Sequence, residues 1–177
     1  MSASIIVLAL LAFVAVTIFK GVRIVPQGYK WIVQRLGKYH STLNPGLNFV
    51  IPYIDEIAYK VTTKDIVLDI PSQEVITRDN AVLVMNAVAY INLTTPEKAV
   101  YGIENYTWAI QNLVQTSLRS IVGEMDLDDA LSSRDHIKAK LKAAISDDIS
   151  DWGITLKTVE IQDIQPSTTM QAAMEAQ

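Results

Sequence analysis

The segment DNAVLVMNAVAYINLTTPE, residues 79–97, contains the change from strands to helices that decides the fold. It opens on Asp79-Asn80, a pair favoured in tight turns, and continues with a β-rich run from Ala81 to Leu93. Thr95-Pro96-Glu97 then places an N-cap residue before a proline at the first helical position, which is typical of a helix start. Strands are therefore expected before this segment and helices after it.

Upstream of residue 79 the chain reads as short strands separated by turn signals. The clearest turn is Asn44-Pro45-Gly46, whose residue types favour a reversal of the chain. The predicted strands are Tyr29 to Arg35, Lys38 to Leu43, Leu47 to Ile51 and Ile66 to Ile70. Because the connections between them are too short for crossover helices, we expect an antiparallel or mixed sheet.

Downstream of residue 97 the apolar residues recur at helical spacing. One stripe ends at Gly123, and a second helix begins after Ser133 and ends before Gly153. The stripes are Ile110, Leu113, Val114, Leu118, Ile121 and Val122 in the first helix, and Ile137, Leu141, Ala144, Ile145 and Ile149 in the second. Alternation returns from Ile154 to Asp163, so this strand is expected to rejoin the earlier sheet. The sequence predicts an α+β fold with helices packed on one face of a mostly antiparallel or mixed sheet.

The N-terminal stretch is apolar and uncharged. None of the 15 basic and 19 acidic residues precedes Lys20. As a helix, Ala3 to Phe19 spans about 25 Å, and extension to Val25, with Lys20 and Arg23 reaching the headgroups, makes it long enough to cross a bilayer. We predict a transmembrane anchor over residues 1–25, and not a cleaved signal peptide, because no Lys or Arg precedes the apolar run. Anchor residues expected to face lipid are Ile5, Leu8, Leu11, Phe13, Val16 and Phe19.

Charge is polarised along the chain, although the net charge is only −4. Residues 20–60 carry six basic and two acidic side chains, whereas residues 61–177 carry nine basic and seventeen acidic ones. The basic flank of the anchor predicts, by the positive-inside rule, a cytoplasmic domain and an N-terminus on the other side. The side chains expected to face anionic lipid headgroups are Lys20, Arg23, Lys30, Arg35 and Lys38. For Lys30, Arg35 and Lys38 the alternative is a solvated strand face, which is the simpler explanation of each one taken singly.

The sequence offers no recognisable catalytic or metal-binding constellation. It has no cysteine, which excludes thiol nucleophiles, disulfides and cysteine-ligated metals. His40 and His136 stand alone, and the glycines never cluster as a phosphate-binding loop does. The acidic stretch Glu124 to Asp129 lacks the central glycine and distal glutamate of a calcium loop and is better explained by capping of a helix that begins near Leu127. We predict no catalytic residues, no metal and no cofactor.

The apolar segment Leu47 to Ile54 has two readings. It is a buried strand ended by Pro52, or it dips into the membrane interface beside the anchor, with Tyr53 at headgroup depth. The possible membrane-dipping residues are Phe49, Val50, Ile51 and Tyr53. Both readings stay open at the level of sequence.

Several short motifs form a specific pattern when they are taken together and in order. They are Val25-Pro26-Gln27-Gly28-Tyr29, Gln34-Arg35-Leu36-Gly37-Lys38-Tyr39, Leu43-Asn44-Pro45-Gly46-Leu47-Asn48, Ile51-Pro52-Tyr53-Ile54-Asp55, Asp69-Ile70-Pro71-Ser72-Gln73-Glu74, Thr77-Arg78-Asp79-Asn80 and Trp152-Gly153-Ile154. The pattern resembles the SPFH (stomatin/prohibitin/flotillin), or band 7, family over about residues 22–177, and is most similar to its bacterial QmcA and paraslipin branch. The resemblance implies an SPFH domain over residues 26–166, followed at 167–177 by the start of a C-terminal helix that leads, in the family, into a coiled coil.

The resemblance also implies a function. It indicates a non-enzymatic, single-pass scaffold in a bacterial inner membrane, which oligomerises into rings or cages, organises membrane microdomains and modulates membrane protein quality control. The implied partners are anionic lipids, other copies of the chain, and an FtsH-type AAA protease or an NfeD-like protein. Some family members place the domain on the opposite side of the membrane. Two alternatives stay open, a monomeric lipid- or ligand-binding module and a membrane-tethered enzyme.

Overall fold

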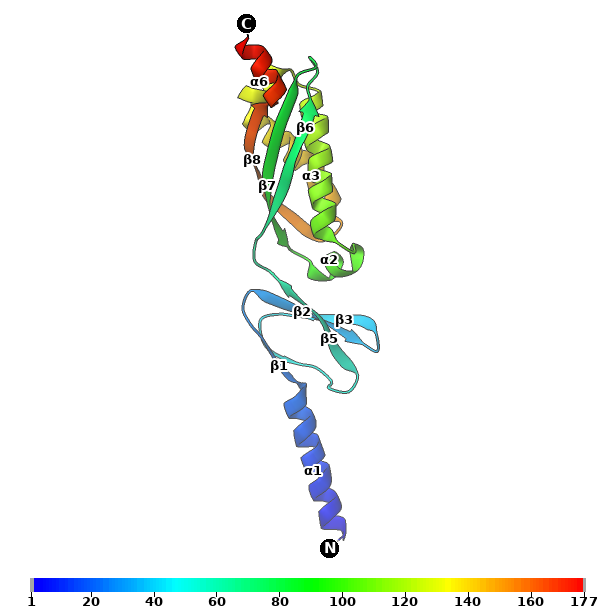
Figure 1. Cartoon of the computed structure of the whole chain (residues 1–177). Coiled ribbons are helices and arrows are strands. Elements are labelled where there is room, and N and C mark those ends of the chain that lie inside the picture. Colours follow the sequence, from blue (N-terminus) through cyan, green and yellow to red (C-terminus); the bar gives the residue numbers. More distant parts are fainter. Residues whose placement is uncertain (1, 177) are drawn as a thin grey trace. The chain divides into compact units, whose positions relative to one another are not determined.

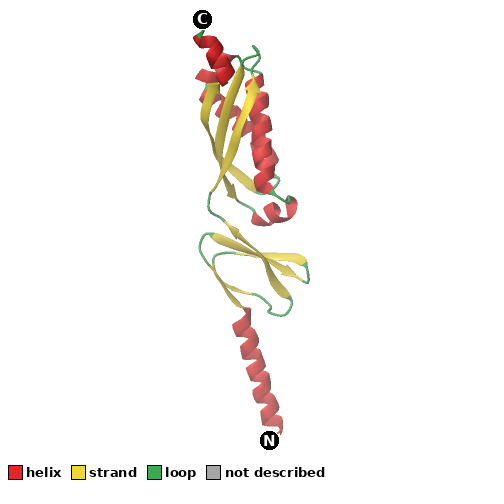
Figure 2. Cartoon of the chain, in the orientation of Figure 1, coloured by secondary structure: helices red, strands yellow, loops and turns green. Residues whose placement is uncertain are grey.

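The computed structural model describes residues 2–176 and divides the chain into two compact units, Met1–Lys64 and Asp65–Gln177. The elements follow one another as helix, strands, helices, strand and helix (Figures 1 and 2). Every strand pair in the described residues is antiparallel. The predicted α+β class is therefore confirmed, and the division into two units adds a boundary inside the single domain expected over residues 26–166.

Helix α1 spans Ser2–Gly21 and ends abruptly where strand β1, Val22–Val25, begins. The Val50 N–H donates to the Gly21 carbonyl at 2.8 Å, so the end of the helix is tied to a distant part of the chain. A Cβ atom on Gly21 would lie 2.5 Å from Phe49 Cε2 and 2.6 Å from the Val50 carbonyl oxygen, which only glycine allows. The predicted extension of the helix to Val25 is wrong, because residues 22–25, three of which are β-branched, pair with residues 46–49 as a strand.

Unit 1 contains two small sheets. Strand β1 pairs with β4, Gly46–Phe49, and β2, Tyr29–Arg35, lies between β3, Lys38–Leu43, and β5, Asp55–Thr62. The β2–β3 hairpin turns at Leu36 and Gly37, both at positive φ, which is the geometry of a two-residue hairpin. The unit's small core consists of Val25, Val33, Leu43 and Val50, with Trp31 packed against it.

Unit 2 is one three-stranded sheet with helices on one face (Figure 1). Its order is β6-β7-β8, in which β6 is Ile66–Ile76, β7 is Val82–Leu93 and β8 is Ile154–Pro166. The helices are α2, Pro96–Gly102; α3, Tyr106–Gly123; α4, Leu127–Ser132; α5, Arg134–Ser150; and α6, Thr168–Glu175. Strand β8 begins opposite Leu93, the last residue of β7, so the predicted return to the sheet is confirmed.

The core of unit 2 follows the periodicities of its elements. Alternate residues of β7 face the helices, while α3 and α5 present their apolar stripes to the sheet. Fully buried side chains of this core are Leu83, Met85 and Ile91 from β7, Ile110 and Leu118 from α3, and Ile137, Leu141, Ile145 and Ile149 from α5. Strand β6 is longer than predicted, because it continues past Pro71 with a register shift between Ile70 and Gln73.

Candidate functional site

Helix α1 is long and apolar enough, by length and composition, to cross a membrane. Residues 3–20 of this helix are exposed or half-buried and only Gly21, its last residue, is buried, and twenty helical residues cover about 30 Å, the thickness of the hydrocarbon core of a bilayer. The residues named above as lipid-facing, Ile5, Leu8, Leu11, Phe13, Val16 and Phe19, are all exposed. This single apolar helix suggests single-pass anchoring in a membrane.

A second apolar surface begins where α1 ends. In the β1–β4 ribbon, Ile24 lies directly opposite Leu47 and Val22 opposite Phe49, so these side chains share one side of the ribbon. Ile24 is 69% exposed, Leu47 76% and Phe49 58%. We call Ile24, Leu47 and Phe49 the ribbon face. Sequence reasoning missed Ile24 and Leu47, because it assigned residues 22–25 to the helix and left Leu47 without a partner strand.

The loop between β4 and β5, residues 50–54, reaches back along α1. The Tyr53 ring is stacked on the ring of Phe13, with centroids 6.2 Å apart. Phe13 lies eight residues before Gly21, which is about 12 Å along a helix axis. The Tyr53 side chain therefore lies beside α1 about two turns before the helix ends.

The structure separates the four residues that were predicted to dip into a membrane. Phe49, Ile51 and Tyr53 are exposed, whereas Val50 is 5% exposed and belongs to the core of unit 1. The prediction that Val50 contacts the membrane is wrong, because its backbone is bonded to the end of α1 and its side chain packs inward. The apolar segment 47–54 is thus partly core and partly surface. We call residues 50–54 the apolar loop.

The base of the apolar loop is held by an ion pair between neighbouring strands. Arg35 Nε lies 2.7 Å from Asp55 Oδ1, and Arg35 Nη2 lies 3.0 Å from Oδ2, a bidentate arrangement. The Ile51 N–H also donates to Asp55 Oδ2 at 2.9 Å, and the Asp55 N–H donates back to the Ile51 carbonyl at 2.9 Å. The Arg35 guanidinium first, and the Ile51 N–H second, lower the pKa of Asp55 to about 2, against the opposing effect of burial. Sequence analysis assigned Arg35 to lipid headgroups, but the structure pairs it with Asp55.

This pKa shift predicts a specific loss of stability in acid. The carboxyl of Asp55 binds its proton more weakly in the folded state than in the unfolded one, so its contribution to stability is full above about pH 4 and is lost as the pH falls towards 2. We expect the pH-dependent part to amount to up to about 2 kcal/mol. Urea unfolding in detergent micelles, followed by tryptophan fluorescence at several pH values, measures it. The difference between the natural chain and Asp55→Asn should shrink as the pH falls from 4 to 2, and parallel pH profiles would contradict the assignment.

The remaining predicted basic residues lie at different places in unit 1. Lys20 is in the last turn of α1, Arg23 is exposed on β1, and Lys38 is exposed at the start of β3. Lys30 is half-buried on β2. Two further lysines lie over aromatic rings: Lys60 Nζ is 4.5 Å from the centroid of the Trp31 ring, and Lys64 Nζ is 5.7 Å from that of Tyr29.

Helix α4 begins at Leu127, as predicted, but its N-cap residue Asp126 makes no side-chain capping bond, so the expected capping by the acidic stretch is wrong. Asp79, in the β6–β7 loop, accepts the N–H of Leu127 at 3.2 Å and so caps α4 from another element. The Thr77 hydroxyl, together with this N–H, keeps the pKa of Asp79 below its ordinary value. Asp126 forms an ion pair with Arg78. Within residues 2–176 no three acidic or histidine side chains gather into a possible metal site.

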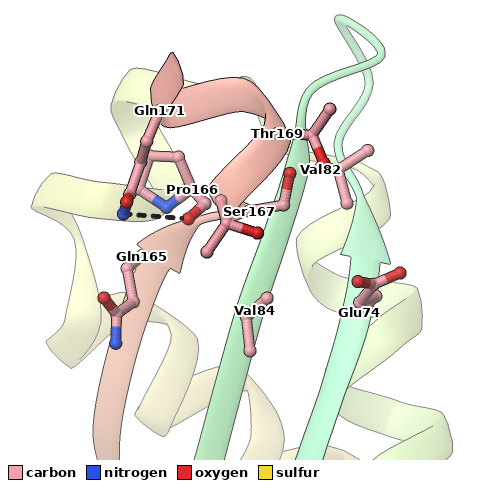
Figure 3. Close-up of a pocket in the computed structure, with 9 residues that line it drawn as sticks. Glu74, Val82, Val84, Gln165, Pro166, Ser167, Thr169 and Gln171 are labelled. Atoms are coloured by element: carbon pink, nitrogen blue, oxygen red, sulfur yellow. Dashed lines mark hydrogen bonds between the residues drawn. The ribbon is translucent and has the colours of Figure 1, made fainter. Parts of the chain in front are cut away.

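A shallow hollow of about 500 Å³ lies where β8 passes into α6 (Figure 3). Its lining residues are Glu74, Val82, Val84, Gln165, Pro166, Ser167, Thr168, Thr169 and Gln171. The Gln171 side-chain amide donates to the Pro166 carbonyl at 3.2 Å, and Ser167 caps α6. Glu74 is the one charged side chain in this lining, so the hollow has no paired acid and base. The apolar surface of unit 1 is the stronger candidate site.

The chain is similar in sequence to a protein family and to several known proteins. A family model described as SPFH domain / Band 7 family matches residues 23–177. A protein of Methanocaldococcus jannaschii is 40% identical over 160 residues, which are 90% of this chain and 80% of that protein. Human mitochondrial stomatin-like protein 2 is 37% identical over 86% of this chain, and an uncharacterised protein of Mycobacterium tuberculosis is 36% identical over 95% of it. The chain spans less than half the length of the human and mycobacterial proteins, 43% and 44% respectively.

Proposed function

We propose, because this chain belongs to the SPFH domain / Band 7 family, that it is a membrane-anchored scaffold that assembles with copies of itself and organises the surrounding bilayer. Family membership suggests a membrane scaffold role, and the family is generally non-enzymatic. The function is then one of binding and positioning. The regions that carry it out are the anchor, the surface that contacts lipid and the surfaces that contact other proteins.

The observation that carries the proposal is the apolar surface of unit 1 next to the end of α1. The ribbon face is exposed directly after the anchor, and the apolar loop places Tyr53 against Phe13 within the apolar helix. Exposed apolar surface of this kind is costly in water and favourable among acyl chains. We therefore propose that the ribbon face, with Ile51 and Tyr53, enters the leaflet on the side of the domain. A scaffold that displaces lipid in one leaflet in this way acts on the bilayer as well as being held by it.

The basic side chains support a preference for anionic lipid and for one side of the membrane. Lys20, Arg23 and Lys38 lie in or near the elements that follow α1, where anionic headgroups attract positive charge. The positive-inside rule then favours a cytoplasmic domain in a single-pass protein of a bacterial inner membrane, with the N-terminus outside. Lys30 is half-buried and Arg35 is paired with Asp55, so both are expected to contribute less to headgroup binding.

The protein partners follow from the family and are part of the proposal. Assembly with copies of the chain into a ring or cage is the expected form of the scaffold. An FtsH-type membrane protease or an NfeD-like protein is the expected second partner, which would link the scaffold to membrane protein quality control. A monomeric lipid-binding module is the alternative that shares the same anchor and the same apolar surface.

Oligomeric state separates the scaffold from the monomeric module. We expect size-exclusion chromatography with light scattering, on the chain in mild detergent and in nanodiscs, to give assemblies many times the protomer mass, increasing with protein concentration. The same samples after cross-linking in the native membrane test whether the assemblies exist before extraction. A monomer at every concentration and in both environments would contradict the scaffold and favour the monomeric module.

A further inference from the structure

The apolar loop has few internal bonds that could hold its shape. Within it, the Ile54 N–H donates to the Ile51 carbonyl at 3.3 Å, a long bond. Pro52 has no N–H to donate. At the tip, Tyr53 is 61% exposed and stacks on Phe13. Apart from this stack, the contacts that position the tip are made by the residues at the base of the loop.

Asp55 makes the side-chain hydrogen bonds at the base of the loop. Its carboxylate accepts two hydrogen bonds from Arg35 on β2 and one from the N–H of Ile51, the residue four positions earlier. The Asp55 N–H bonds the Ile51 carbonyl in return, and the Leu36 N–H in the neighbouring hairpin donates to the Ile54 carbonyl at 3.2 Å. The Asp55 side chain is 3% exposed, while that of Arg35 is 35% exposed. The carboxylate thus ties Ile51 to the end of the loop and to β2, while Val50 and Ile54 are held separately by backbone bonds to Gly21 and Leu36.

The Arg35–Asp55 pair also neutralises a charge next to the apolar loop. A lone carboxylate one residue after an apolar loop would resist entry into lipid, because charge is expensive in a medium of low dielectric constant. Bidentate pairing with Arg35 neutralises the carboxylate and fixes its geometry, and a lysine in place of Arg35 could not make both bonds.

We infer that the Arg35–Asp55 pair is a clamp that positions the apolar loop against α1 and so sets how deeply Ile51 and Tyr53 enter the bilayer. This inference rests on the lipid contact proposed above. Arg35 and Asp55 act through the loop and are positioning residues. The clamp does not hold the ribbon face, because Ile24, Leu47 and Phe49 are placed by β1–β4 pairing.

The absence of cysteine from the chain allows a clean test of the clamp. Ile51→Cys places a fluorescent label on the apolar loop, and Leu47→Cys places the same label on the ribbon face as a matched control. The labelled full-length proteins are reconstituted into vesicles of phosphatidylcholine and phosphatidylglycerol that carry quenchers at defined acyl-chain depths. Each label is then measured in the natural background and in Arg35→Gln, Arg35→Lys and Asp55→Ala.

We expect both labels to be quenched by the lipid probes in the natural background. Arg35→Gln and Asp55→Ala should lower quenching at residue 51 by about two-fold or more and leave it unchanged at residue 47. Arg35→Lys, which keeps the charge and is the variant most certain to fold, should give a smaller loss at residue 51 alone. Unchanged quenching at residue 51 in all three variants would overturn the clamp and leave the lipid contact standing. Equal losses at both positions would also overturn it, since they indicate general unfolding.

A second measurement separates failure of the clamp from failure of the lipid contact. Phe13→Cys with Tyr53→Cys reports whether the loop lies along α1, because the two rings are in contact in the natural chain. A flexible bifunctional thiol reagent should join the two cysteines in the natural background and do so several-fold more slowly with Arg35→Gln. If neither residue 47 nor residue 51 is quenched in the natural background, the lipid contact fails. The inferred effect on depth then fails with it, whatever the cross-linking rate shows about the loop.

Discussion

Replacing Leu8 and Leu11 together by lysine should release the protein from membranes that otherwise retain it after carbonate extraction. Both residues lie in the middle of α1 and are exposed there. A lysine at the centre of a spanning helix costs about 2.5 to 3.5 kcal/mol, so the pair costs about 5 to 7 kcal/mol of insertion free energy. We expect the double variant to appear mainly in the soluble or extractable fraction, measured by immunoblotting of fractions from cells.

The matched control for this experiment is Phe19→Lys. Phe19 is as exposed and as apolar as the two leucines, but it adjoins Lys20 in the last turn of α1, from where a lysine can reach the headgroups. This variant should stay resistant to carbonate. Equal resistance of the double variant would show that α1 does not anchor the protein, and the proposed function would lose its first part.

The second large effect is expected at Gly153, in the turn between α5 and β8. Gly153 has a φ of 68°, and a Cβ atom there would lie 2.4 Å from the Thr95 carbonyl oxygen and 2.8 Å from Thr95 Cβ. The Gly153 carbonyl also accepts the Thr95 N–H at 2.9 Å, so the backbone cannot move away without losing that bond. Gly153→Ala should lower the free energy of unfolding by about 3 kcal/mol, through a steric clash and a strained backbone together. Chemical unfolding followed by circular dichroism measures this loss.

A substitution at Gly37 separates the effect of backbone strain from that of the steric clash. Its φ is 81°, also in the left-handed region, but nothing lies within 4 Å of the Cβ position. Gly37→Ala therefore carries the backbone strain alone and should cost about 1 kcal/mol. If the two variants lose equal stability, close packing of Gly153 against Thr95 has no energetic weight and the larger prediction is wrong.

Most of the helices and strands were predictable because their signals are local. The alternation in β7, the apolar stripes of α3 and α5, and the proline at the start of α2 each depend on neighbouring residues. Strands β1 and β5 were not predicted. For β1 the reason is that its boundary depends on a contact with a distant part of the chain. Val22–Val25 continues an apolar helix without a break in composition, and only the contact of Gly21 with β4 shows that the helix has ended.

The candidate site was predictable in part. The segment 47–54 stands out by its apolar character beside an apolar helix, and the structure divides it: Val50 is core, whereas Phe49 and Tyr53 are surface residues whose contact with a membrane stays a proposal. The position of Ile24 could not be found, because its neighbour Leu47 is 23 residues away in the chain. Arg35 looked like a headgroup ligand because sequence shows its charge but not its partner.

The sequence by itself determined the apolar N-terminal helix, the α+β class, the change from strands to helices along the chain, and the family. These follow from composition, periodicity and motif order, which lie within short stretches of the chain. Only the tertiary structure decided where α1 ends, which side chains of the β1–β4 ribbon are exposed, and that Arg35 is bound to Asp55. The reason is physical: a strand presents its residues alternately to its two faces, and the pairing of distant strands decides which face is buried and which charges meet.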